Sequence, residues 1–496
     1  MWAIWANFTD RANTLIPDTI ALHQQPLRFI HASDLHLERT IEGVTECPAH
    51  WEQRMLDIST KATERLFRKC LEEEIDFLVL SGNVLDANLA PPGIFLFLVE
   101  QLERLRKAGI AVYWAGGEFD SPEDLPKAFP LPDNVHRFPS NSIQEFYFHR
   151  TEGPDTLPVA KLVGMSRNQR NRRIRSSEFP LEPGGLFTIA VANGEVEPET
   201  LMQRHIDYWA MGGNNRRNTF YGNPRKKGPD GKPLPLDPEY RINARDRKDL
   251  PPQPFVVHYP GPTLARTPSD IGLYGATLVE TILDKSGRPL EDPMLTHFST
   301  SPIRWINDRV ILEATDDGGK LADELRQRLR NYREAQKGDD LFINWLVDVP
   351  PGQLAHHLRR GGLTNDLLSE LRAMYGQDEP MTWSVSISVL VPEQLSKSSY
   401  EQQTILGDFL RSVKHFQDNP QELIHLGGYI PQNWEHDEEI KHLLLAEKVT
   451  DEITDAEDRE PKERWIQSPS QTENQQRVLR EAAMTGLELF AQTDKN

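Results

Sequence analysis

Polar residues with the chemistry of metal ligands follow an apolar segment near the start of this sequence. Leu27 begins a β-prone apolar run that ends in Asp34-x-His36. Two residues apart in an extended segment, a carboxylate and an imidazole point the same way, which suits one metal ion. An isolated Asp-x-His is more often a strand end whose Asp caps the next turn. The metal interpretation therefore depends on partners at the ends of later strands.

Four further apolar runs are predicted to be strands, and each is followed by glycine and small polar residues. They are residues 77–80, 110–115, 186–192 and 208–211. Helices are expected at about 48–74, where apolar residues recur every three to four positions, and from Pro91 to Gly109. This alternation implies a parallel sheet with right-handed crossovers, whose carboxyl edge would gather the polar residues. The alternative is a set of ordinary tight turns.

The composition is that of an ordinary globular protein. Its 496 residues are enough for two or three domains, and 38% hydrophobic with 26% charged residues is usual. A net charge of −19 argues against nucleic-acid binding through overall charge, although a local basic surface is compatible with it. Two isolated cysteines support neither a disulfide scaffold nor a zinc finger. With no leader-like segment and no apolar run of about 18 residues, we expect a cytoplasmic protein without membrane contact.

Five motifs occur in the order of one known enzyme family. They are Asp34-x-His36, Gly82-Asn83-x-x-Asp86, Gly117-Glu118-Phe119-Asp120, Asn193 and Gly212-Gly213-Asn214-Asn215. In this order they resemble the calcineurin-like metallophosphoesterase superfamily, and most closely its DNA-repair exonuclease branch of SbcD-like and YhaO-like nuclease subunits. The similar stretch covers about residues 27–305, helped by Tyr259-Pro260-Gly261 and by Gly275 to Glu280. The resemblance implies a layered α/β sandwich with a two-metal centre at its strand ends.

Most positions at which that family binds metal are changed in this chain. The family pattern is Asp-x-His, Gly-Asp, Gly-Asn-His-Asp, a lone His and Gly-His-x-His, and only the first motif is intact. By this resemblance, Asn83 replaces the bridging carboxylate, Glu118 the ligand Asn, and Phe119 the catalytic His. The positions that have lost a family histidine further along the chain are Asn193, Gly213 and Asn215. The resemblance thus implies a weak or vestigial metal site formed by Asp34, His36, Asn83, Glu118 and Asn193.

These replacements remove chemistry that a two-metal phosphoesterase needs. The amide of Asn83 cannot supply the negative charge that offsets repulsion between two ions about 3.5–4 Å apart. Phe119 cannot transfer a proton, so the chain lacks the roughly 10²–10⁴-fold rate enhancement that general acid–base catalysis provides. We therefore expect no catalytic residue and a pseudoenzyme with a hydrolase fold. An alternative stays open, in which Asp34, His36 and Glu118 bind one manganese, magnesium or calcium ion weakly and support an unorthodox phosphoesterase or exonuclease.

Basic residues are concentrated in two segments. The first follows an apolar run at 159–163, and the second lies in a Pro- and Gly-rich insertion at about 214–254, directly after the fifth motif. The residues expected to contact DNA phosphates are Arg167, Arg170, Arg172, Arg173, Arg175, Arg216 and Arg217. The alternative is that these arginines are solvated loop residues paired with the many carboxylates of the protein.

The chain changes character after Trp305. Residues 306–434 are predicted to form a small α+β domain, which by its place resembles the capping domain of the exonuclease branch. Its expected strands are 304–313, 341–349 and 382–391, and its expected helical segments are 320–335, 353–375 and 399–416. Residues 1–26 are interpreted as an extension and 435–496 as an acidic tail, partly disordered. An apolar stripe in that tail could dock on a partner or fold back, and consists of Leu479, Ala483, Leu487 and Phe490.

The function that this resemblance implies is a non-catalytic one. We expect a DNA-binding or partner-binding subunit of a nuclease–ATPase assembly in DNA repair. The expected partners are an SbcC-like ATPase subunit, DNA held by the basic segments, and a second copy of the chain. The open alternative is the active phosphoesterase described above.

Overall fold

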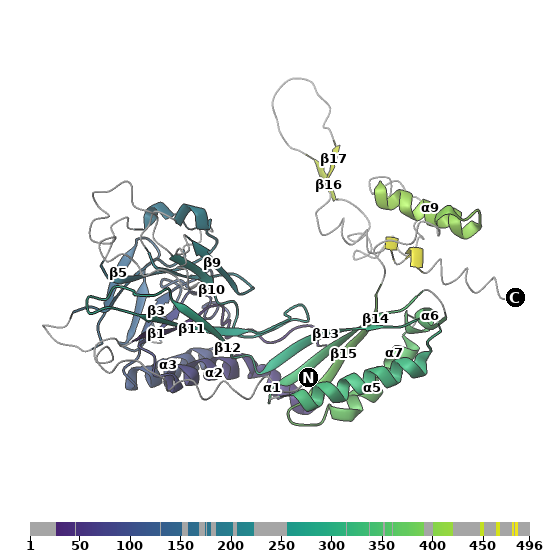
Figure 1. Ribbon diagram of the computed structural model, residues 1–496, viewed down its shortest axis with the longest axis horizontal. Coiled ribbons are helices and arrows are strands. Elements are labelled where there is room, and N and C mark those ends of the chain that lie inside the picture. Colours follow the sequence, from purple (N-terminus) through teal and green to yellow (C-terminus); the bar gives the residue numbers. More distant parts are fainter. Residues whose placement is uncertain are drawn as a thin grey trace, which may run out of the picture. The chain divides into compact units, whose positions relative to one another are not determined.

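The chain forms two compact units, which the computed structural model shows in Figure 1. The first is Met1–Trp305 with Gly338–Asp340, and the second is Ile306–Lys337 with Leu341–Asn496. The structure describes residues 26–44, 46–128, 130–150, 157–167, 174, 176–179, 185–201, 206–222, 255–313, 315–336, 338–350, 353–359, 361–390, 400–419, 447–450, 463–466, 479–480 and 482–484. The predicted N-terminal extension and most of the basic insertion lie outside these residues.

The first unit contains two six-stranded sheets. One has the strand order β12-β11-β1-β2-β3-β4. Its strands are β1 (Pro26–Ala32), β2 (Phe77–Leu80), β3 (Ala111–Ala115), β4 (Val135–Phe138), β11 (Gly275–Ile282) and β12 (Met294–Ser299). Strands β1 to β4 are parallel to one another, whereas β11 runs antiparallel to both β1 and β12.

The other sheet has the order β5-β6-β7-β8-β10-β9. Its strands are β5 (Gln144–Phe148), β6 (Ala160–Gly164), β7 (Phe187–Asn193), β8 (Tyr208–Gly212), β9 (Asn218–Gly222) and β10 (Phe255–Tyr259). Here β6, β7, β8 and β10 are parallel, and the edge strands β5 and β9 are antiparallel to their neighbours. The predicted parallel pairing is confirmed for β1, β2 and β3. Both sheets also have antiparallel strands at their edges, which the sequence did not indicate.

Two helices, α2 (Ile58–Glu72) and α3 (Pro92–Lys107), cover the first sheet on one face, as Figure 1 shows. A short helix, α1 (Ala49–Leu56), precedes α2. The apolar faces of α2 and α3 pack on Ile30, Leu78 and Val112 of the sheet. The single helix expected at 48–74 is two helices, because the backbone at Asp57 leaves the helical conformation with ψ of 4°. Near the end of α3, Gly109 has φ of +75°, which suits a residue without a Cβ.

The opposite face of the first sheet packs on the second sheet. Side chains of β1 alternate between the two layers, so that Phe29 joins the core between the sheets while Ile30 faces the helices. Polar contacts also cross this otherwise apolar interface. His31 of β1 lies 3.0 Å from the hydroxyl of Tyr208 through Nδ1 and 2.8 Å from Ser81 Oγ through Nε2. This layered α/β sandwich confirms the fold class predicted from the sequence.

The second unit contains a three-stranded sheet in the order β13-β14-β15. These strands are β13 (Ile303–Ile311), whose first residues belong to the first unit, β14 (Asp340–Asp348) and β15 (Thr382–Val389). The helices are α5 (Gly318–Ala335), α6 (Gln353–Arg359) and α7 (Gly362–Tyr375). Leu321, Leu325 and Leu329 of α5 pack against Ile343 and Trp345 of β14. The single helical segment expected at 353–375 is interrupted at Gly361, which has φ of +85°.

A separate small core lies further along the second unit. Helix α9 (Ile405–Asp418) buries Leu410 and Val413 against Leu479 and Ala483. This part of the predicted apolar stripe therefore folds back on the chain, whereas Leu487 and Phe490 lie outside the described residues. Strands β16 (Glu447–Thr450) and β17 (Glu463–Ile466) form an antiparallel pair. Among the described residues, no helix has the length and apolar character to cross a membrane.

Candidate functional site

The ends of five strands, β1, β2, β3, β7 and β8, meet at one place in the first unit. Glycines allow the backbones to approach closely there. A Cβ on Gly82 would lie 2.6 Å from the backbone nitrogen of Gly117, and a Cβ on Gly212 would overlap the carbonyl oxygen of Ser81. These glycines are therefore required by the packing of main chain on main chain. Polar residues beside them occupy positions that the motif order predicts to share one site.

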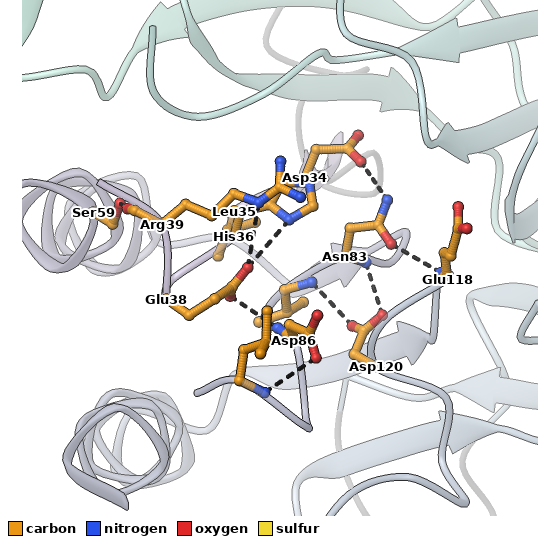
Figure 2. Close-up of polar contacts among 12 residues, drawn as sticks. Asp34, Leu35, His36, Glu38, Arg39, Ser59, Asn83, Asp86, Glu118 and Asp120 are labelled. Carbon is orange, nitrogen blue, oxygen red and sulfur yellow. Dashed lines mark hydrogen bonds and ion pairs between the residues drawn. The ribbon is translucent and has the colours of Figure 1, made fainter. Parts of the chain in front are cut away.

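Asp34 and Asn83 form the centre of this site, as Figure 2 shows. Asp34 is buried, and its Oδ1 accepts a hydrogen bond of 2.8 Å from Asn83 Nδ2. Its Oδ2 accepts hydrogen bonds from Ser33 Oγ at 2.7 Å and from the Gly213 backbone N–H at 3.0 Å. Burial raises the pKa of Asp34, against the opposing effect of these donors. Both carboxylate oxygens are thus occupied by protein donors.

The amide of Asn83 bridges two loops. Its Nδ2 donates to Asp34, and its Oδ1 accepts a 2.9 Å hydrogen bond from the Glu118 backbone N–H. Asn83 has φ of +57° and Asp34 has φ of +54°, a region in which Asn and Asp are tolerated better than most residues. Gly117 leaves the space for this amide, because a Cβ there would overlap Asn83 Oδ1. An amide can donate and accept at once, so Asn83 joins a carboxylate to a backbone N–H.

Asp120 holds the same loops from the other side. It is fully buried and accepts four hydrogen bonds, from the backbone N–H groups of Asn83, Val84 and Gly117 and from Trp114 Nε1, at 2.6 to 3.0 Å. Burial raises the pKa of Asp120, and these four donors oppose the rise. The sequence indicated Asp120 only as the last residue of a motif, with no role of its own. Its role in the structure is to fix the turns after β2 and β3.

Asn193, at the end of β7, is a residue through which the second sheet contacts these strand ends. Its side chain is buried, and Nδ2 donates a 2.8 Å hydrogen bond to the Ser81 carbonyl. A Cβ on Gly213 would lie 3.0 Å from Asn193 Oδ1. Asn193 therefore ties the second sheet to the end of β2 in the first sheet. Asn215, at the last motif position, is exposed.

His36 and Phe119 lie on the other side of the Asp34 turn. Their rings meet edge to face with centroids 5.8 Å apart, and the guanidinium of Arg39 lies 5.8 Å from the Phe119 centroid. His36 Nδ1 is 3.6 Å from Glu38 Oε1, so the imidazole is directed toward Glu38. Burial tends to raise the pKa of Glu38, but the contacts with His36 and with the Asp86 N–H outweigh this effect and lower the pKa. Glu38 was not predicted from the sequence, because it follows the Asp34-x-His36 motif by two residues in an irregular segment.

A buried arginine supports the same turn from behind. The guanidinium of Arg266 donates to the backbone carbonyls of Leu35 and His36. Burial lowers the pKa of Arg266 to about 10, while the carboxylates of Glu38 and Asp270 favour its charged form. These contacts satisfy carbonyl groups in the turn that carries Asp34 and His36. No motif in the sequence pointed to Arg266.

Glu118 is turned away from this cluster. Its side chain is 45% exposed, and Oε2 pairs with the guanidinium of Arg167 at 3.1 Å. Its backbone N–H, in contrast, donates to Asn83. Thus the main chain of Glu118 belongs to the site, while its carboxylate serves an ion pair at the rim.

With this geometry in view, the chain can be compared with known proteins. The profile of the family described as calcineurin-like phosphoesterase matches residues 27–285, more than half of the chain. The chain belongs to the calcineurin-like phosphoesterase family. Members of this family normally bind divalent metal ions. The match covers every strand end described above.

One relative of this phosphoesterase is an uncharacterized metallophosphoesterase, YhaO, from Bacillus subtilis. The two are 31% identical over 208 residues, which are 39% of this chain. The aligned part spans 50% of the Bacillus subtilis protein, about half of its length. A solved dimetal phosphatase from Danio rerio superposes with a TM-score of 0.27 and 8% identity, over 55% of this chain and all of the other.

The residues at the strand ends do not fit a divalent ion as they are arranged. Among the described residues, there is no group of three His, Cys, Asp or Glu side chains that could hold a metal. Asp34 already accepts three protein donors, and the Asn83 oxygen accepts the Glu118 N–H. Asp34 Oδ2 already accepts two of these donors, so a metal ion bound to this oxygen would have to displace one of them. The donor atoms at the strand ends of this phosphoesterase therefore differ from the metal ligands that its family normally uses.

The structure describes some, but not all, of the arginines predicted to contact DNA. Arg216 and Arg217 are exposed just after β8, whereas Arg167 is engaged with Glu118. Four of the predicted DNA-contacting residues lie outside the described residues, namely Arg170, Arg172, Arg173 and Arg175. Of the histidines nearest to the motifs in sequence, His258 and His297 line another pocket, and His205 lies outside the described residues. The DNA-binding role of these arginines stays a prediction.

Proposed function

We propose that this calcineurin-like phosphoesterase is a non-hydrolytic, DNA-binding or partner-binding subunit of a DNA-repair nuclease–ATPase assembly. The single observation that carries the non-hydrolytic part is the state of Asp34. Its two oxygens accept hydrogen bonds from Ser33, Asn83 and Gly213, so the protein itself supplies the partners that metal ions supply elsewhere in the family. A network that satisfies a buried carboxylate in this way holds the fold together without metal.

The aromatic ring at Phe119 supports the same proposal. Its position follows β3 in the motif where the family resemblance implies the catalytic histidine. The ring packs between His36 and Arg39 and carries no proton that a leaving group could take. The loss of this proton donor comes in addition to the missing metal ligands. Both changes act against hydrolysis, while the glycines keep the strand ends in place.

The binding part of the proposal is supported by the basic residues and by the motif order. Arg216 and Arg217 are exposed and directly follow the fifth motif in the sequence. Arginines on such a surface can contact phosphates without reading sequence. The resemblance of the motif order to the exonuclease branch is what suggests DNA, and an SbcC-like ATPase, as partners. A homodimer is a further candidate assembly.

Metal content and turnover of the purified full-length chain test the non-hydrolytic part. We expect less than one manganese ion per chain by mass spectrometry after incubation with manganese and desalting. Hydrolysis of bis-p-nitrophenyl phosphate should not exceed that of an Asp34→Ala variant. Turnover that depends on manganese and disappears in Asp34→Ala would contradict the proposal. It would favour the alternative, an unorthodox single-metal site that uses Asp34, His36 and Glu118.

A further inference from the structure

A polar pocket lies between the two sheets of the first unit, at strands β9, β10, β11 and β12. It has a volume of about 280 Å³. The polar side chains that line it and that matter here are Arg217, Thr219, Tyr221, His258, Thr277 and His297. Most of the remaining interface between the sheets is a core of apolar side chains. A group of polar residues at this edge therefore calls for a specific explanation.

Strand geometry explains why these side chains face one another. Thr219 is paired with His258 across β9 and β10, and Thr277 is paired with His297 across β11 and β12. Tyr221 lies two residues beyond Thr219, so it is on the same face of β9. Two cross-strand pairs, one from each sheet, thus form the inner surface of the pocket.

His258 connects the two sheets at the floor of the pocket. Its Nδ1 lies 2.8 Å from Thr219 Oγ1, and its Nε2 lies 2.8 Å from Thr277 Oγ1. Burial lowers the pKa of His258 to about 3, so the ring is neutral and has one N–H. The threonine that accepts this N–H keeps its own hydroxyl proton for another acceptor. One of the two threonine hydroxyls therefore has a proton that His258 does not accept.

The charge at the pocket is positive. Arg217 is exposed at the rim, and none of the described residues that line the pocket is Asp or Glu. Burial and the nearby Arg217 guanidinium lower the pKa of His297 to about 4. Arg217 is close enough to contribute to the lowered pKa of both His258 and His297, after burial as the main cause. An anion would be stabilised by the same positive charge.

His297 has hydrogen-bonding capacity that the described residues leave unused. Both of its ring nitrogens are buried, and neither has a hydrogen-bond partner of normal geometry among the described residues. The nearby Leu273 backbone favours the protonated ring without closing such a bond. Buried polar atoms are nearly always satisfied, so an unpartnered imidazole in a positive pocket points to a ligand that accepts hydrogen bonds.

We propose that this pocket binds a phosphate-type oxyanion, held by the guanidinium of Arg217, an N–H of His297 and one threonine hydroxyl. Its volume lies just below the roughly 300–1,000 Å³ of typical ligand pockets, which fits a phosphate or a small phosphate monoester. The pocket is built from β9 to β12 and shares no residue with the cluster of Asp34, Asn83 and Asp120. This inference does not depend on the proposed function.

Calorimetric titration of the full-length chain with inorganic phosphate, and separately with ribose 5-phosphate, tests the proposal. We expect saturable binding of at least one of them, and the stronger of the two identifies free phosphate or a phosphate monoester as the source. Arg217→Gln and His297→Gln should each weaken binding by about tenfold or more. Lys285→Gln, which removes one positive charge from an exposed turn outside the pocket, should leave binding unchanged.

Histidine-selective ¹⁵N labelling gives a second measurement that needs no variant to fold. Addition of phosphate to the unaltered protein should shift the ring nitrogen signals of His297, because one of them gains a hydrogen bond. The inference is overturned if neither compound binds, or if binding is equally strong in Arg217→Gln, His297→Gln and Lys285→Gln. Binding that leaves every histidine ring signal unchanged would also overturn it.

Discussion

The buried imidazole of His258 makes the stability of the first unit depend on pH in a predictable direction. Burial is the main cause that lowers its folded-state pKa to about 3, with Arg217 and His297 adding to the effect. In the unfolded chain a histidine has a pKa of about 6.5. Between these values the unfolded chain binds a proton that the folded chain does not. Acidification therefore favours unfolding, and the loss of stability begins as the pH falls through about 6.5.

The size of this loss follows from proton linkage. From about pH 7 to about pH 5, the contribution of His258 to the free energy of unfolding should fall by about 1.9 kcal/mol. His31 is also fully buried, and burial lowers its pKa well below the ordinary value, so it acts in the same direction. A variant that lacks only His258 should lose about 1.9 kcal/mol less stability over this interval than the unaltered protein.

Urea unfolding at both pH values, followed by tryptophan fluorescence in buffers without phosphate, measures this difference. His258→Gln is expected to be less stable than the unaltered protein near pH 7, because Gln cannot bond both Thr219 and Thr277 as the ring does. Its loss between pH 7 and pH 5 should nevertheless be smaller. His149→Gln, at an exposed position, is the matched control. Equal losses in His258→Gln and His149→Gln would refute the reasoning.

Three further predictions concern the strand ends and the basic segments. Asp34→Ala should lower the free energy of unfolding by about 2–5 kcal/mol in denaturant titrations, because the donors of Asn83 and Gly213 lose their acceptor. Asp34→Asn should lower it by less. A metal-free Asp34→Ala protein that is more stable than its parent would contradict this prediction. Calorimetric titration with manganese should detect two bound ions in a variant that restores the family's metal-ligand pattern. If this variant binds no more manganese than the parent protein, the prediction is contradicted. That variant carries Asn83→Asp, Glu118→Asn, Phe119→His, Asn193→His, Gly213→His and Asn215→His. Binding of duplex DNA should weaken steeply as the salt concentration rises. The slope of the logarithm of the binding constant against the logarithm of the salt concentration should decrease in magnitude by up to about 2.7 when three arginines are changed together. An unchanged slope would mean that these arginines do not contact phosphates. Those changes are Arg170→Ala, Arg172→Ala and Arg173→Ala.

Five buried strands of the first unit, β1, β2, β3, β7 and β8, could be predicted from the sequence because they are continuous apolar runs. The buried strands β6, β10 and β11 were not predicted. The expected strands at 77–80 and 110–115 agree with β2 and β3 to within one residue. The edge strands β4, β5, β9 and β12 were missed, because their residues are half exposed and carry no strong period. The antiparallel pairing of β11 with β1 joins segments far apart in the chain, so no local pattern indicates it.

The site was predictable only in part, for a related reason. Motif positions identify where Asp34, Asn83 and Asn193 lie along the chain, and the structure brings these residues to converging strand ends. The sequence does not reveal which way a side chain turns, and Glu118 points to Arg167 at the rim. The contribution of Asp120 depends on four donors from three separate loops and strands, which only the folded chain brings together.

The hydrogen bonds that join the two sheets have a consequence for the way this unit can open. Contacts between apolar side chains of the two layers have no preferred direction. The contacts of His31 with Tyr208 and of His258 with Thr277 are directional and buried, so even a small displacement breaks them without water to replace them. Amide protons of β1 and β10 should therefore exchange with solvent together, in one cooperative opening of both sheets.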